Sequence, residues 1–245
     1  MDFTVVFFDN VKRILNKVEA TQKEKIQMGA QVVADTIKND GIVYTFGTGH
    51  SHCVAEEVTY RAGSLAPIDA ILEPSLTGTT DVVKSEQLER IEGISRVILE
   101  HRRVTSRDCM IIISNSGRNG APIEMAIECK KKGIPTIAIT SLEYAKNVAS
   151  RHSSGKKLYE VADIVIDNCG VFGDATVYLE GSKVPMGSTS NIIGNCIIHA
   201  ITIEAAQILI KNGIEPPVFL SGNLDNCKEV NQKLLDKYWG RIKMW

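Results

Sequence analysis

Residues 42–52 read IVYTFGTGHSH, a short apolar run rich in β-branched and aromatic residues that passes directly into a loop with two glycines. Such a run predicts a buried strand, and the glycines after it predict a tight turn. The pattern recurs at residues 108–120, DCMIIISNSGRNG, where a second apolar run ends in a second polar loop. A segment with helical spacing follows each loop, so a strand–loop–helix unit occurs twice.

The rest of the chain extends this alternation. Further apolar runs lie at residues 66–72, 134–140 and 162–168, separated by helical or loop segments. Continuous apolar strands separated by helices predict an α/β fold, a three-layer sandwich with a central parallel sheet and helices on both faces. We expect two helices within residues 3–39, and one long apolar helix from Ser190 to Lys211 that ends at the glycine of Asn212-Gly213.

Composition limits the class of partner. The chain has 245 residues and 44% hydrophobic content, with 28 Lys and Arg against 29 Asp and Glu, which gives a formal net charge of -1. No global positive field would draw it to nucleic acid or to an acidic membrane, so we expect a small-molecule partner. The N-terminus lacks the pattern of a signal peptide, and a cytoplasmic location is expected. The six cysteines form no CxxC pair and are interpreted as core residues.

The two loops carry the candidate chemistry. In open parallel sheets, ligands bind where strands end and helices begin, because helix N-termini offer unpaired N–H groups to an anion. The loops at 47–51 and 114–120 supply glycines, hydroxyls and an amide, and neutral donors of this kind suit a phosphate. A dinucleotide site is disfavoured because His52 stands at the sixth position of GxGxxG, and no GxxxxGK[ST] motif supports a P-loop.

The loop pair GTGHS and SNSGRNG resembles the two phosphosugar-binding loops of the SIS (sugar isomerase) family, written GxGxS and SxSGxT, with Asn119 in place of the usual Thr. The segment VPMGSTSN at 184–191 is similar to the Ser/Thr-rich turn before the long helix of that family. The resemblance covers about residues 41–213, and it implies a flavodoxin-like doubly wound sheet that binds a phosphorylated sugar. The substrate-binding residues that it implies are Gly47, Gly49, His50, Ser51, His52, Ser114, Asn115, Ser116, Gly117, Asn119, Ser188, Thr189 and Ser190.

The resemblance also suggests how the chain is organised. We expect one SIS domain over residues 1–245, with N-terminal helices in 1–40, a core at 41–213 that carries an inserted segment near 73–107, and a C-terminal tail at 214–245. SIS relatives commonly build their sites between subunits, so a homodimer or homotetramer is expected.

Candidate catalytic residues follow from the chemistry of aldose–ketose isomerisation, which needs a base for a proton next to a carbonyl. Glu56 and Glu57 lie on the helix after the first loop, about 100° apart around it, so at most one should face a bound sugar. The segment SHCVAEEV resembles the phosphoheptose isomerase branch, which implies that a histidine of the long helix assists. His199 is the candidate, with Asn195 as a polar neighbour.

Three functions stay open at this stage. Proton abstraction would serve a sugar-phosphate isomerase or an etherase or lyase, whereas a phosphosugar sensor would have no chemistry. We expect no cofactor. His52 and Glu56 are four residues apart, a spacing that suits two ligands of one zinc ion, but a third ligand from His50 or His199 would be needed.

Overall fold

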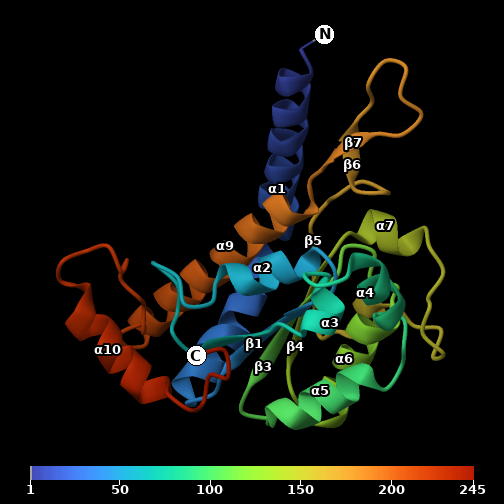
Figure 1. Cartoon of the computed structure of the whole chain (residues 1–245). Coiled ribbons are helices and arrows are strands. Elements are labelled where there is room, and N and C mark those ends of the chain that lie inside the picture. The colour runs from blue at the N-terminus through green and yellow to red at the C-terminus, as the bar shows by residue number, and fades with distance from the viewer. Residues whose placement is uncertain (1) are drawn as a thin grey trace.

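Five parallel strands form the central sheet of the computed structural model, which describes residues 2–245 (Figure 1). The sheet order β2-β1-β3-β4-β5 is that of flavodoxin-like, doubly wound folds. The predicted parallel α/β architecture is confirmed. The strands are β1 (Val43–Gly47), β2 (Ile68–Ile71), β3 (Cys109–Ile113), β4 (Thr136–Thr140) and β5 (Ile164–Asp167).

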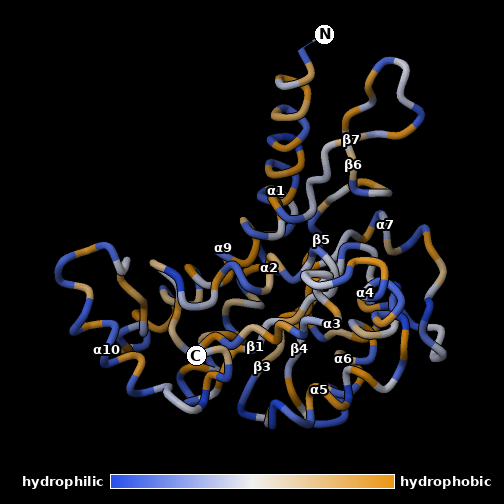
Figure 2. The backbone as a smooth tube through the Cα atoms, viewed as in Figure 1, coloured by the Kyte–Doolittle hydropathy of each residue, from blue (hydrophilic) through white to orange (hydrophobic). Residues whose placement is uncertain are grey.

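Side chains alternate across this sheet, and the alternation builds two cores. In β3, Cys109, Ile111 and Ile113 face one layer, whereas Met110 and Ile112 face the other. The first core packs against α1 (Phe3–Lys38), α2 (Ser51–Glu57) and α9 (Ser190–Lys211). The second packs against α3 (Pro74–Thr77), α5 (Ile94–Arg102), α6 (Gly120–Lys131), α8 (Leu158–Val161) and α10 (Cys227–Tyr238). The hydrophobic colour of β1 and β3 in Figure 2 reflects burial from both sides.

The remaining elements are short. The helix α4 (Val82–Leu88) lies between α3 and α5 in the chain, and α7 (Leu142–Lys146) follows β4. The strands β6 (Ala175–Val177) and β7 (Met186–Ser188) form an antiparallel hairpin. This hairpin and the N-terminal part of α1 project together from the body of the protein (Figure 1).

The expectation of two N-terminal helices is wrong, because α1 is one continuous helix of 36 residues. The polar stretch at residues 19–25, EATQKEK, separates the two apolar groups but holds no Gly or Pro, and its residues mostly favour helix. Its apolar stripe continues on both sides of this stretch, from Val11 and Ile14 to Ile26 and Val33. A polar stretch without a helix breaker therefore does not end a helix.

The long helix α9 has the bounds expected for it, Ser190–Lys211. It is the one helix within residues 2–245 that is long and apolar enough to cross a membrane by length and composition. Its apolar character has another cause, because Ile193, Ile197, Ile198 and Ile201 are buried against α1 and α2.

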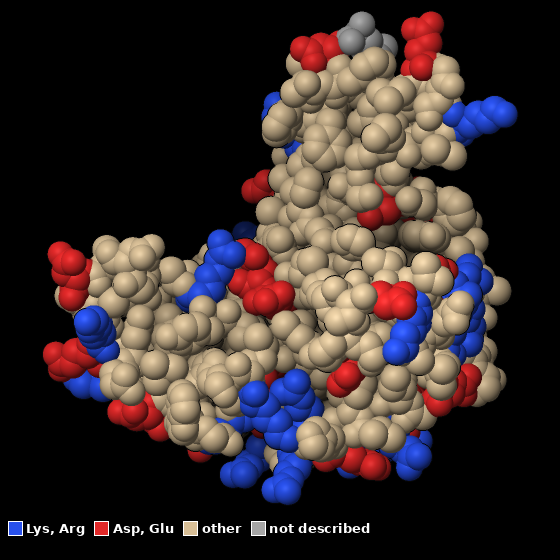
Figure 3. All heavy atoms as spheres, viewed as in Figure 1, with Lys and Arg blue, Asp and Glu red and all other residues tan. Residues whose placement is uncertain are grey.

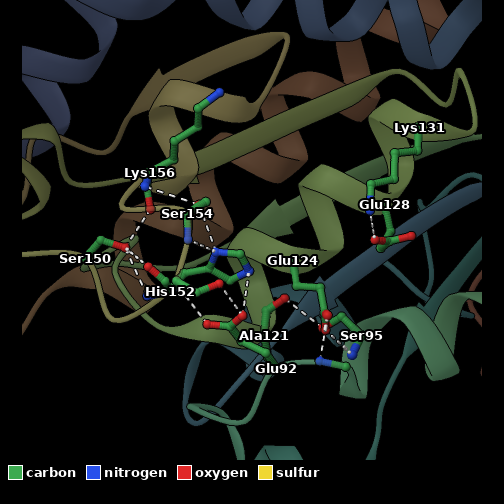
Figure 4. Close-up of polar contacts among 12 residues, drawn as sticks. Glu92, Ser95, Ala121, Glu124, Glu128, Lys131, Ser150, His152, Ser154 and Lys156 are labelled. Carbon is green, nitrogen blue, oxygen red and sulfur yellow. Dashed lines mark hydrogen bonds and ion pairs between the residues drawn. The ribbon is translucent and has the colours of Figure 1, made fainter.

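A buried carboxylate of the body holds the start of α5, within the segment at residues 73–107. Glu124 of α6 is only 8% exposed, and its two oxygens accept hydrogen bonds from the backbone N–H groups of Gly93 (2.6 Å) and Ser95 (2.8 Å) at the start of α5 (Figure 4). Glu92 is bound in turn by the N–H and hydroxyl of Ser153. Because α5 begins at a glycine without a capping side chain, Glu124 supplies the cap from another helix.

We expect Glu124→Ala to lower the free energy of unfolding by about 1–3 kcal/mol, because it leaves two N–H groups at the start of α5 without a partner. Glu128→Ala is the matched control. Glu128 lies one turn later on α6, and within residues 2–245 its carboxylate pairs only with the exposed Lys131 side chain. Urea unfolding of both variants tests this, and equal losses of stability would contradict the capping role.

Candidate functional site

The first loop makes a tight turn from β1 into α2. Gly47 ends β1, and a Cβ at this position would lie 2.5 Å from the backbone oxygen of Ser51, so no larger residue fits. The turn places Ser51 at the first position of α2, and in residues 2–245 its hydroxyl makes no hydrogen bond. This hydroxyl is half-buried and available to a ligand.

The second loop follows β3 and is braced from within. The N–H of Gly117 donates to the Ser114 hydroxyl (3.3 Å), and the Asn115 side chain accepts a hydrogen bond from Asn168, just after β5 (2.9 Å). The Ser116 hydroxyl forms no hydrogen bond within the described chain, and it is half-buried. Ser114 and Asn115 therefore shape the loop, whereas Ser116 has a free donor.

A glutamate that sequence reasoning missed connects the two loops. Glu89, from the inserted segment, accepts hydrogen bonds from the Thr48 hydroxyl (2.6 Å) and from the Asn119 side-chain amide (2.6 Å). Burial raises the pKa of Glu89, and the Thr48 hydrogen bond opposes the shift. Asn119 also accepts a hydrogen bond from Arg151 (3.0 Å). The amide of Asn119, which was expected to bind the ligand, is thus bound by protein groups. Nothing in the local sequence around Glu89 indicates this contact.

Residues of the inserted segment also pack beside the first loop. The backbone N–H of Gly49 donates to the carbonyl of Leu76 in α3 (2.8 Å). A hollow of about 310 Å³ lies beside this contact. It is lined by the loop residues Gly49, His50, His52 and Cys53 and by Thr77, Gly78, Thr79, Val82, Ser85, Glu86 and Glu89 of the insertion. The insertion is therefore part of the wall around the first loop.

The Ser/Thr-rich turn before α9 is held by Asp174, another residue that sequence reasoning missed. Its carboxylate accepts from the N–H groups of Thr189 (3.2 Å) and Ser190 (2.9 Å) and from the Ser190 hydroxyl (2.6 Å). Thr189 is buried, and Ser188 is exposed in β7. These contacts cap α9, so the assigned ligand-binding role of this turn remains a prediction.

The two glutamates after the first loop point in different directions, as their helical spacing predicts. Glu56 is exposed, whereas Glu57, the last residue of α2, is 21% exposed and faces α9. Glu57 Oε1 lies 3.1 Å from Nε2 of His199 and 2.7 Å from a guanidinium nitrogen of Arg61. A carboxylate only accepts, so Nε2 of His199 carries the hydrogen. Arg61 lies beyond the end of α2, so helical spacing does not account for this second contact.

A glycine of α9, Gly194, makes the contact between Glu57 and His199 possible. A Cβ at Gly194 would lie 3.0 Å and 3.3 Å from the two methyl groups of Val54 in α2. The absence of a side chain lets α2 approach α9 closely. Glu57 lies three residues after Val54, and His199 lies five residues after Gly194, so this close approach brings the two side chains together.

The described residues of one chain do not form a complete set of zinc ligands. No group of three His, Cys, Asp or Glu side chains placed to hold a metal occurs in residues 2–245. His52 turns toward its own loop, with Nδ1 2.6 Å from the Gly49 carbonyl oxygen, which assigns the ring hydrogen to Nδ1. Glu56 points to solvent.

We expect Gly194→Ala to destabilise the protein by about 1–3 kcal/mol, because the added methyl group overpacks the contact with Val54. Val54→Ala removes the opposing methyl groups, so the double variant should lose less than the sum of the two single losses. A double-mutant cycle by urea unfolding measures this coupling. Strict additivity would show that the two residues do not control the approach of α2 to α9.

Comparison with known proteins agrees with this geometry. A family model described as the SIS domain matches residues 6–141. A UPF0309 protein of Halalkalibacterium halodurans is 46% identical over 226 residues, which cover 92% of this chain and 93% of the relative. A UPF0309 protein of Geobacillus kaustophilus is 43% identical over 236 residues, which cover 96% of this chain and 94% of the relative.

Solved structures support the fold. Phosphoheptose isomerase from Neisseria gonorrhoeae superposes with a TM-score of 0.56 at 18% identity, over 84% of this chain and 98% of that chain. The Vibrio vulnificus NanR protein, complexed with ManNAc-6P, superposes with a TM-score of 0.53 at 13% identity, over 97% of this chain and 69% of that chain. The two serine loops, the sheet order and the sequence relatives all lead to the same assignment: the chain belongs to the SIS domain family.

Proposed function

We propose that this protein is a sugar-phosphate enzyme that abstracts a proton next to a carbonyl, as an aldose–ketose isomerase or a related enzyme does. In this proposal the phosphate binds at the two serine loops and Glu57 is the base. The observation that carries the proposal is the contact between Glu57 and His199 at the far end of the helix that begins at Ser51.

The phosphate end of the proposal is supported by donors that the fold leaves open. The hydroxyls of Ser51 and Ser116 follow the adjacent strands β1 and β3, and within residues 2–245 neither makes a hydrogen bond. The helix α6, of 12 residues, begins directly after the second loop, and its N-terminus favours a negative charge. Neutral donors and a helix end together suit a phosphate group that keeps its charge.

The base end is supported by how Glu57 is held. Its Oε1 atom contacts the side chains of both Arg61 and His199. Its Oε2 atom has no partner within the described residues. One oxygen thus fixes the carboxylate and the other is available for a proton. Glu57 lies six residues after Ser51 along α2, about 9 Å along the helix axis at 1.5 Å per residue. A sugar with its phosphate at Ser51 can extend over such a length.

His199 has a positioning role in this proposal. Its Nε2–H donates to Glu57, which orients the carboxylate and leaves Nδ1 free to face a substrate oxygen. The neighbours with known ligands are consistent with this substrate class, since the NanR structure holds ManNAc-6P.

We expect Glu57→Gln to bind a sugar phosphate and to lose about 10²- to 10⁴-fold in the rate of exchange at C2, the range typical for loss of a general base. Glu56→Gln is the matched control, because its exposed side chain takes no part and its exchange rate should equal that of the parent. The measurement incubates the proteins with hexose, heptose and amino-sugar phosphates in deuterated water and follows deuterium by NMR.

Ser116→Ala should weaken binding of the same ligand by about 1–3 kcal/mol.

Two results would overturn parts of the proposal. If both glutamine variants exchange at the parental rate, neither glutamate is the base. If the parent exchanges nothing across the panel but is stabilised by one sugar phosphate, the protein is a phosphosugar sensor without chemistry.

We also propose that the protein is a homo-oligomer that associates through its projecting arm, defined as the N-terminal part of α1 and the β6–β7 hairpin. Large apolar side chains are exposed there: Val5 (52%), Phe8 (57%), Tyr178 (72%), Val184 (65%) and Met186 (58%). A groove of about 480 Å³ also lies between α1 and α9, and its lining includes the apolar Leu15, Ile26, Ala200 and Ile203 beside Glu19, Lys23 and Glu204. Exposed apolar side chains gathered on one part of a surface favour burial in a partner.

We expect sedimentation at micromolar concentration to give a species larger than the 26.9 kDa monomer. Phe8→Asp with Tyr178→Asp should shift it toward the monomer, because charged residues are costly in a buried interface. Val82→Asp with Val83→Asp is the control, since these exposed valines lie on α4, away from the arm. A parent that sediments as a monomer would contradict the proposal.

A further inference from the structure

A polar hollow lies at the opposite end of the sheet from the serine loops. Its volume is about 670 Å³, within the range of small-molecule sites. It is bordered by the start of β1, the end of α5 with the loop after it, and the C-terminal segment. Five cationic side chains line it, Arg102, Arg103, Arg107, Arg241 and Lys243, against three acidic ones, Asp40, Glu100 and Asp108. Figure 3 shows Lys and Arg gathered on the surface between α5 and the C-terminal end of the chain.

The acidic side chains of the hollow are already engaged. Asp108, 7% exposed, accepts from the N–H groups of Ile42 (2.8 Å) and Thr105 (2.7 Å) and from the Thr105 hydroxyl (2.8 Å). Asp40 pairs with Arg241 (2.9 Å). Glu100 lies 4.0 Å from Arg96, outside the hollow. Within residues 2–245 none of these carboxylates forms an ion pair with Arg103 or Arg107.

The cations are not all used by the fold. Arg102 reaches the fully buried Asp69 (3.4 Å), and the Lys243 ammonium donates to the carbonyl of His101 at the end of α5. Arg103 and Arg107 are exposed, and neither forms an ion pair within residues 2–245. Five cationic side chains against three acidic ones leave the lining with a formal charge of about +2, and Arg103 and Arg107 are its two arginines without an ion pair within residues 2–245.

A second observation is independent of these charges. Tyr44 of β1 lines the hollow, and although the residue is only 5% exposed, its hydroxyl oxygen stays accessible and makes no hydrogen bond within the described residues. The hydroxyl is therefore a free donor that the hollow leaves open to a ligand. Burial and the nearby Asp108 and Asp69 carboxylates raise the pKa of Tyr44, so the hydroxyl keeps its hydrogen and can donate it.

We propose that this hollow is a second binding site, separate from the serine loops, for a small dianion such as a phosphate monoester. Arg103 and Arg107 would neutralise the dianion, and the Tyr44 hydroxyl would donate to it from the floor. An arginine guanidinium matches the geometry of phosphate oxygens. The hollow is too small and too local for a nucleic acid strand, which needs a long basic surface.

The position of the site connects it to the serine loops. Tyr44 and Gly47 lie three residues apart on β1, about 10 Å along the strand. An anion bound at the amino end of β1 therefore contacts the strand that carries the first serine loop at its other end. This proposal does not depend on the function proposed above.

The test uses inorganic phosphate as the probe and the ¹⁵N-labelled full-length protein. Titration should move amide signals of residues 100–108 and 240–243 in a saturable way. Arg103→Ala with Arg107→Ala should raise the Kd of this site by at least about tenfold, as loss of charged hydrogen bonds predicts. Tyr44→Phe should weaken it without loss of charge. Lys12→Ala with Arg13→Ala is the control: it removes the same charge from exposed positions on α1 and should leave the Kd unchanged.

Each alternative result is decisive. Shifts confined to residues 47–51 and 114–120 would overturn this inference while supporting the proposed function. Equal weakening by the control pair would show a general charge effect and no site. Absence of saturable shifts at residues 100–108 and 240–243 with millimolar phosphate would also overturn it. Circular dichroism of the Arg103/Arg107 variant excludes misfolding, and Tyr44→Phe gives a second, uncharged test.

Discussion

The pairing of β1 with β3 is the constraint on which the site depends. The two strands run parallel and in register from Val43 beside Cys109 to Gly47 beside Ile113, although 66 residues of chain separate each pair. Because both strands end at the same level, both serine loops open on the same edge of the sheet. Neither loop alone offers more than a tight turn with a few donors. The hydrogen-bonded ladder between the strands is what makes one site of them.

Much of the fold could be predicted, because its signals are local. The strands are continuous apolar runs, and α9 begins after a Ser/Thr turn and ends before Gly213. Glu57 was foreseen as one of two candidates, since the helical repeat separates neighbours by about 100°. The contact of Glu57 with His199 was not foreseen as a pair, because it depends on a glycine of α9 that fits against Val54. Sequence patterns within one helix do not indicate such a fit.

The residues that sequence analysis missed share a physical cause. Glu89, Glu124 and Asp174 each bind backbone or side-chain donors that lie between 15 and 41 residues away in the chain. A helix cap supplied by the residue before a helix has a recognisable spacing, whereas a cap supplied by a distant carboxylate has none. The prediction of two helices in place of α1 was wrong for a different reason. A polar stretch was interpreted as a boundary between helices, although its residues favour helix.

The carboxylate of Glu89 has a thermodynamic consequence for any anion that binds between the serine loops. Its pKa is already raised by burial, and a phosphate placed nearby would raise it further through charge repulsion. Under the proposed mode of binding, ligand uptake is then accompanied by proton uptake. Affinity increases as the pH falls toward the pKa of this carboxyl group, and the heat of binding depends on the ionisation enthalpy of the buffer. A single half-buried acid thereby links the occupancy of the site to the acidity of the solution.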